Sequence, residues 1–185
     1  MPKYAETAIK EAFIALLEEE PLNRITVKDI VQKSGLNRNS FYYHFHDIVD
    51  LTEQIVEDTV RTVIDEHPTV DSIDEACETA LALILKNKKV IFHIYHSGNR
   101  AIFEQALLRL CEYAVSVYVS SAAAVETLTR EDRALLVRFL KYETFGMYIS
   151  WLDGGMKEEE MEDIRRLTKL ARAASHAVLT GQITL

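Results

Sequence analysis

Residues 38–43 bring together side chains that can recognise another molecule through hydrogen bonds. The segment Arg-Asn-Ser-Phe-Tyr-Tyr holds a guanidinium, an amide and two phenols within six positions. At helical spacing, Phe41 and Phe45 fall on one face, one turn apart. The outward or partly outward positions are Arg38, Asn39, Tyr42 and Tyr43. Such groups can contact base edges and phosphates in a DNA major groove about 12 Å wide. The alternative from the pattern alone is a three-helix bundle whose cations are simply solvated.

A short helix and a sharp turn precede this segment. Thr26 is the expected N-cap of that helix, and Asp29 stands three residues later, where a capping box needs its acidic partner. The helix is expected to end near residue 33. Gly35 can adopt the left-handed conformation that a tight turn between two helices requires.

The second helix is expected to begin after Asn37, a suitable N-cap, and to end at about His44. Leu36 is expected to fill the turn between the two helices. The segment 26–45 therefore has the spacing of a helix-turn-helix, in which the second helix enters the major groove.

The net charge of the chain is −8, which taken alone argues against a polyanionic partner. The charge is unevenly distributed, however. Residues 21–46 carry four cations and one carboxylate, a local charge of +3, so the other residues carry −11. Counterion release depends on the local field where cations meet phosphates. The composition thus predicts a small, localised contact surface for DNA.

The pattern of apolar residues predicts an all-α protein. Only six Gly and three Pro interrupt the chain, and no long stretch alternates as an exposed strand does. About nine helices are expected, a three-helix head followed by a C-terminal helical bundle. Their approximate ranges are 3–19, 26–33, 38–44, 47–66, 71–87, 88–96, 100–125, 130–152 and 157–180.

Other functional classes find little support in the sequence. The N-terminus does not resemble a secretory signal, and no apolar stretch approaches the roughly 20 residues that span a bilayer, so a cytoplasmic protein is expected. Cys77 and Cys111 are expected to be reduced, buried thiols. His93 and His96 have the spacing of a metal-binding pair but lack a third ligand nearby. No catalytic constellation is visible, so neither an enzyme nor a cofactor or metal site is expected.

The motifs of residues 25–47 resemble the signature of the TetR (tetracycline repressor) family. The matching runs are Ile-Thr-Val-Lys-Asp-Ile-Val from residue 25 and Ser-Gly-Leu-Asn-Arg-Asn-Ser-Phe-Tyr-Tyr-His-Phe-His-Asp from residue 34, and the likeness spans residues 7–55. The run Trp151–Met156 resembles a subgroup that includes a dihydroxyacetone kinase coactivator. The resemblance implies a DNA-binding domain over 1–46 and a ligand-sensing and dimerisation domain over 47–185.

The resemblance also implies which side chains contact DNA. Thr26 and Lys28 are expected at phosphates, and Arg38, Asn39 and Ser40 at base edges. The backbone contacts are expected from Tyr42, Tyr43 and His44. The chain departs from the family at Ile48, where a Lys usually donates to a phosphate. Because His46 is a weaker substitute, we expect operator binding with a shallower salt dependence than is typical of the family.

A pocket for an unknown small-molecule effector is implied among the middle helices. The candidates for its lining are Tyr95, His96, Phe103, Tyr113, Phe139, Tyr142, Phe145 and Trp151. Each of these aromatic residues is also an ordinary core residue at helical spacing.

A homodimer is expected, since one helix-turn-helix contacts too few base pairs for specific binding. Apolar faces on the last two long helices would join the subunits. The sequence thus predicts a ligand-responsive repressor that binds a palindromic double-stranded DNA operator. A coactivator that acts through a protein partner, and a purely structural helical dimer, remain alternatives.

Overall fold

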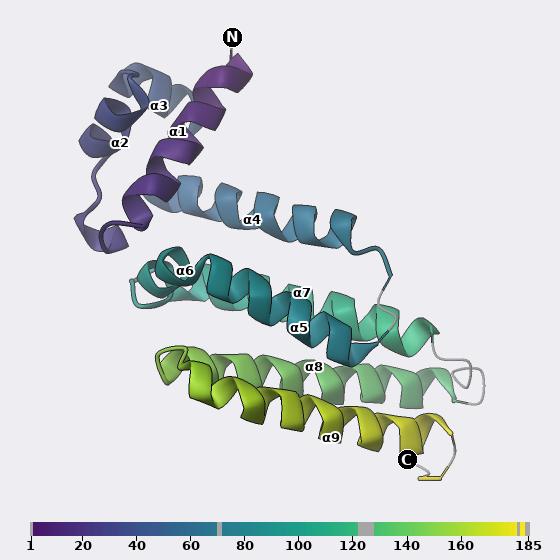
Figure 1. Cartoon of the computed structure of the whole chain (residues 1–185). Coiled ribbons are helices and arrows are strands. Elements are labelled where there is room, and N and C mark those ends of the chain that lie inside the picture. The colour runs from purple at the N-terminus through teal and green to yellow at the C-terminus, as the bar shows by residue number, and fades with distance from the viewer. Residues whose placement is uncertain (1, 70–71, 122–127, 181, 184–185) are drawn as a thin grey trace. The chain divides into compact units, whose positions relative to one another are not determined.

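The computed structural model describes residues 2–69, 72–121, 128–180 and 182–183. These described residues form nine α-helices and no strand, which confirms the all-α fold class (Figure 1). The helices are α1 (Pro2–Leu17), α2 (Val27–Ser34), α3 (Arg38–His44), α4 (Ile48–Glu66), α5 (Ile73–Lys86), α6 (Lys88–Tyr95), α7 (Arg100–Ser121), α8 (Arg130–Asp153) and α9 (Met161–Leu179).

Two short 3₁₀ helices, η1 (Leu22–Arg24) and η3 (Glu158–Glu160), were not expected from the sequence. The second occupies the start of the segment expected to be helical from residue 157, so the acidic run is divided between η3 and the first turn of α9. The predicted end of the seventh helix at residue 125 lies outside the described residues.

The chain forms two compact units. The first contains Met1–Thr62 and Asn87–Ala106, and the second contains Val63–Lys86 and Leu107–Leu185. The first unit therefore extends beyond residue 46, where the sequence suggested a domain boundary. Residues from α4 and α6 belong to it because their apolar side chains complete its core.

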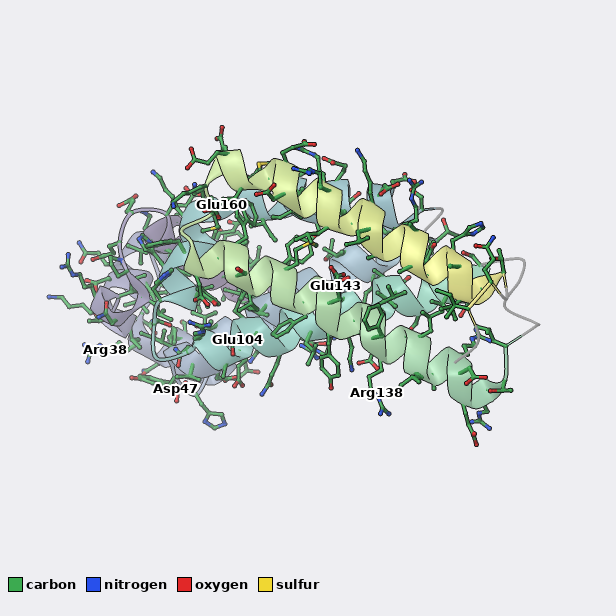
Figure 2. All side chains as sticks on the ribbon, turned by 90° about the horizontal axis from the view of Figure 1, so that it is seen from below. Arg38, Asp47, Glu104, Arg138, Glu143 and Glu160 are labelled. Carbon is green, nitrogen blue, oxygen red and sulfur yellow. The ribbon has the colours of Figure 1, made fainter. Side chains whose placement is uncertain are left out.

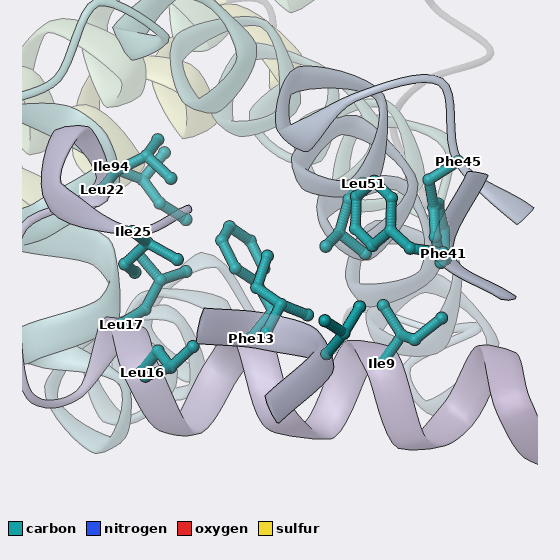
Figure 3. Close-up of a cluster of buried hydrophobic side chains, with 12 residues drawn as sticks. Ile9, Phe13, Leu16, Leu17, Leu22, Ile25, Phe41, Phe45, Leu51 and Ile94 are labelled. Carbon is teal, nitrogen blue, oxygen red and sulfur yellow. The ribbon is translucent and has the colours of Figure 1, made fainter. Parts of the chain in front are cut away.

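The core of the first unit surrounds Phe13 of α1 (Figure 3). Side chains from α1, α3, α4 and α6 meet here and are almost fully buried. They include Ile9, Phe13, Leu17, Phe41, Phe45, Leu51 and Ile94. Burial of such side chains contributes about 1.5–3 kcal/mol each to the folded state. This core fixes α3 to α1, and with it the face that α3 presents to solvent.

In the second unit, α8 and α9 run antiparallel and pack on each other (Figure 1). Their buried side chains join those of α7 in a separate core, formed by Val115, Val119, Leu136, Leu140, Ala171, Val178 and Leu179. Helix α9 also packs on α5. Arg165 donates two hydrogen bonds to Glu78, at 2.6 and 3.1 Å, and Arg172 lies 3.1 Å from Asp74. Exposed pairs of this kind contribute only about 0–1 kcal/mol, so apolar packing holds the unit together.

Candidate DNA-binding site

The N-terminus of α2 is closed by the capping box that the sequence predicts. The Thr26 hydroxyl oxygen accepts a hydrogen bond from the Asp29 backbone N–H at 3.3 Å, and the Thr26 N–H donates to the Asp29 carboxylate at 2.9 Å. The Thr26 hydroxyl also donates to this carboxylate. At the other end Gly35 has a φ of 70°, as expected for the turn. Both ends of α2 are thus fixed by local hydrogen bonds.

We predict that Thr26→Ala lowers the free energy of unfolding by about 1 kcal/mol, since the loss of an N-cap typically costs this much. Hydrogen bonds from Thr26 hold the pKa of Asp29 below its ordinary value. The stabilisation linked to Asp29 is therefore present above its unfolded pKa and is lost as the pH falls through its lowered folded pKa. Urea denaturation of the wild type and of Thr26→Ala, at a series of pH values in the acid range, measures both effects. If the stabilisation linked to Asp29 were instead lost as the pH rises, the prediction would be contradicted.

Helix α3 is capped by Asn37, whose side-chain oxygen accepts from the Ser40 N–H at 2.9 Å. Phe41 and Phe45 are buried, and their ring centres lie 5.7 Å apart. The opposite face is open to solvent: Tyr42 is 58% exposed and Tyr43 is 76% exposed. The sequence correctly divided this helix into a buried and an exposed face.

The structure brings the eight predicted DNA contacts onto α2, α3 and their N-caps. The exposed residues among them are Thr26, Lys28, Arg38, Asn39, Tyr42 and Tyr43, whereas Ser40 and His44 are half-buried. Arg38 extends outward from the first unit (Figure 2). The Ser40 hydroxyl donates to the Asn37 side chain, and the Thr26 hydroxyl both donates to and accepts from Asp29 within the capping box.

Ile48, the position at which the resemblance led us to expect a Lys, packs within the first unit. It is half-buried and packs against the core of the first unit, at the first residue of α4. Asp47 caps this helix by accepting from the Asp50 N–H at 2.9 Å. His46 is exposed next to it, and its N–H donates to the Asp50 carboxylate at 2.8 Å.

A second candidate site is a cavity of about 180 Å³ within the second unit. Its wall is formed by side chains of α5, α7, α8 and α9 and by the chain from Val63 to Ser72, as far as it is described. Buried residues such as Leu107, Val115 and Met147 line its inner part. His67, Thr69 and Glu75 are exposed, and so mark where the cavity opens to solvent.

Of the eight aromatic and histidine residues predicted to contact an effector, Tyr113 lines this cavity, and the other seven are absent from its described lining. Tyr95, His96 and Phe103 belong to the first unit. Phe139 and Tyr142 are exposed on α8, whereas Phe145 is half-buried. Trp151 is buried, and its indole N–H donates to the Lys157 carbonyl at 2.9 Å, closing the connection from α8 to η3. Most of the wall is formed by smaller residues, which a search of the sequence for aromatic side chains does not identify.

The pair His93 and His96 is engaged in packing. His93 Nδ1 lies 2.7 Å from the Leu17 carbonyl oxygen, and the His96 ring stacks on Phe92 with a centroid distance of 4.1 Å. Among the described residues, no group of three potential ligands could hold a metal ion. None of the described helices combines the length and apolar character of a membrane span.

A capped helix-turn-helix with a polar exposed second helix, followed by a helical bundle, defines the class of helix-turn-helix transcriptional regulators. Comparison with known families agrees with this. Residues 9–55 match the bacterial regulatory proteins of the tetR family, and residues 71–173 match a transcriptional regulator C-terminal region of the TetR type. The chain belongs to the TetR family of transcriptional regulators, which implies regulation through DNA binding.

Individual relatives are distant. An uncharacterised HTH-type transcriptional regulator, YxbF of Bacillus subtilis (strain 168), is 22% identical over 216 residues; the match covers 97% of this chain but 56% of that protein, so the chain spans about half its length. The solved structure of the dihydroxyacetone kinase operon activator DhaS has a TM-score of 0.62 at 18% identity, covering 97% of this chain and 96% of that one. A TetR transcriptional regulator from Rhodococcus sp. RHA1 has a TM-score of 0.57 at 18% identity, with coverage of 91% and 96%.

Proposed function

We propose that this protein is a ligand-responsive repressor in the cytoplasm that binds a palindromic DNA operator as a homodimer. The observation that carries the proposal is the exposed face of α3, where Arg38, Asn39, Tyr42 and Tyr43 stand on a helix anchored by Phe41 and Phe45. A dimer sets two such helices about 34 Å apart, one turn of B-DNA.

Footprinting on the DNA that flanks the protein's own gene tests the proposal. The expected result is protection of a palindrome with half-sites one helical turn apart. A protein that protects no such site even at low salt, where phosphate contacts are strongest, is not an operator-binding repressor. Action through a protein partner then becomes the better explanation.

Exposed apolar side chains support the homodimer. They lie on the outer faces of α8 and α9, while the opposite faces of these helices are buried within the unit. The exposed set is Leu135, Phe139, Tyr142, Leu167 and Leu170. Phe139 is 55% exposed and Leu170 65%. Apolar groups gathered on neighbouring helices are typical of an interface, because each would otherwise remain in contact with water.

We predict that Leu170→Glu converts the dimer to a monomer at micromolar concentration, because a charge on this face must be desolvated at the interface. The subunit itself should stay folded, since the side chain is exposed in it. Sedimentation velocity and circular dichroism measure the two effects. Lys169→Glu, an exposed change on the neighbouring position of α9, is the matched control. Equal dissociation of both variants, or of neither, would exclude this face as the interface.

The position of Ile48 gives a further prediction about operator binding. Ile48→Lys is expected to steepen the slope of log K against log salt by about 0.9 for each added phosphate contact, one per half-site. The half-buried site lets the lysine stem keep part of the apolar contact. Fluorescence anisotropy with labelled operator over a salt series measures the slope. An unchanged slope would place residue 48 away from the phosphates.

The cavity in the second unit supports a response to a small molecule. A ligand bound there would favour a spacing of the two heads that no longer fits the operator. A coupling free energy on the order of 1–3 kcal/mol is typical of such linked sites.

A further inference from the structure

The charges that line the cavity of the second unit are all of one sign. Glu143 of α8 is a half-buried lining residue, and Glu75 is exposed at the opening. No lysine or arginine belongs to the described lining, and His67, also exposed, is the single described group there that can become cationic. An anionic ligand would therefore meet carboxylates without a compensating cation.

Three hydroxyl groups of the wall already donate hydrogen bonds within the protein. The Tyr113 hydroxyl donates to the His67 carbonyl at 3.0 Å, and the Tyr148 hydroxyl donates to the Cys77 carbonyl at 3.4 Å. The Thr168 hydroxyl donates to the Ile164 carbonyl at 2.9 Å. These three hydroxyls are therefore not free donors for a ligand, whereas Glu143 offers acceptor oxygens.

Glu143 is itself in an unfavourable environment for a charge. Burial raises the pKa of its carboxyl, and a hydrogen bond from the Thr144 side chain only partly opposes this effect. No cation contributes to the shift. In Figure 2 Glu143 lies on a different side of α8 from the exposed Arg138. A ligand that brings a positive charge to Glu143 would relieve the cost of burying the carboxylate.

The cavity limits the size of such a ligand. Its volume of about 180 Å³ is close to that of an engineered apolar protein cavity of roughly 150 Å³ that accommodates benzene. Leu107, Val115 and Met147 provide apolar contact for one ring or a short branched chain. A substantially larger molecule would have to extend through the opening near His67 and Glu75.

We propose that the effector of this regulator is a small apolar amine, bound in the cavity of the second unit with its ammonium group paired to Glu143. This inference rests on the proposed function for its regulatory meaning, but the binding itself does not require DNA. The aromatic or aliphatic part of the amine fills the space between α5, α7 and α8. The opening near Glu75 attracts the cation before it enters.

Three probes of similar shape and different charge test the proposal: 2-phenylethylamine as the cation, propylbenzene as the neutral molecule and 3-phenylpropanoate as the anion. Isothermal titration calorimetry of the full chain at neutral pH measures each affinity. The amine is expected to bind at least tenfold more tightly than the anion. No detectable amine binding, or tighter binding of the anion, overturns the proposal.

Variants assign the effect to one carboxylate. Glu143→Gln is expected to weaken amine binding at least tenfold and to leave propylbenzene binding unchanged, which also shows that the cavity is intact. Glu131→Gln, an exposed change on the same helix and outside the cavity, should alter neither affinity. Equal amine affinity in the wild type and Glu143→Gln overturns the pairing. Failure of the operator footprint with normal amine binding would refute the proposed repressor but not this ligand class.

Discussion

Arg38→Ala is expected to lower the affinity for the operator about 5- to 150-fold for each half-site, the largest effect on function that we predict. A good bidentate contact to a base contributes about 1–3 kcal/mol of discrimination. Arg38 is the first residue of α3 and is exposed, and its side chain has no partner among the described residues. Its guanidinium is thus free to bind a base without first breaking another contact. Fluorescence anisotropy at fixed salt, with matched and mismatched operators, measures the loss.

Two controls distinguish the loss of a base contact made by Arg38 from a general loss of positive charge. Arg166→Ala removes an exposed cation from α9 in the second unit and should leave operator affinity nearly unchanged. Thermal unfolding of Arg38→Ala should match that of the wild type. Should both arginine variants bind equally well, α3 is not the DNA-contacting helix, and the regulator acts through a protein partner.

Phe41→Ala is expected to lower the free energy of unfolding by about 3–5 kcal/mol, the largest effect on stability that we predict. The ring is fully buried, and it lies 5.7 Å from the ring of Phe45 between centroids. Its removal leaves a cavity at the point where α3 meets α1 and α4, and the packed core relaxes only in part. Urea denaturation followed by circular dichroism measures the loss.

Tyr43→Ala is the control for this effect, because its ring is 76% exposed on the same helix. Its unfolding free energy should change by about 0.5 kcal/mol or less, as is usual for surface positions. A comparable loss of unfolding free energy in both variants would mean that the whole of α3 is only marginally stable. Its stability would then not depend especially on Phe41.

The sequence predicted well the features that local chemistry determines. The caps by Thr26 and Asn37 depend on residues only three positions away, and each forms the expected hydrogen bond. The left-handed Gly35 likewise needs only its neighbours. The fold class and the exposed face of α3 follow from these local signals and from the 3.6-residue period.

Features that arise from packing between distant segments could not be predicted from a single sequence. Most of the cavity wall consists of small aliphatic, hydroxyl and thiol side chains, which carry no distinctive pattern, so the search for aromatic residues found Tyr113 alone of eight. Helix α8 has apolar residues on two faces. The apolar pattern alone does not separate them, although Leu135 is exposed and the adjacent Leu136 is buried.

The membership of α6 in the first unit limits how such regulators can be recombined. Ile94 is buried in the core around Phe13, and His93 bonds to the Leu17 carbonyl, although both follow α5 in the chain. A chimera that exchanges only the first 46 or 62 residues with a relative would pack the relative's α1 against the α6 of this chain, whose side chains are not matched to it. Transfer of operator specificity between paralogues therefore requires grafting α6 together with the head, or confining the exchange to the exposed residues of α3.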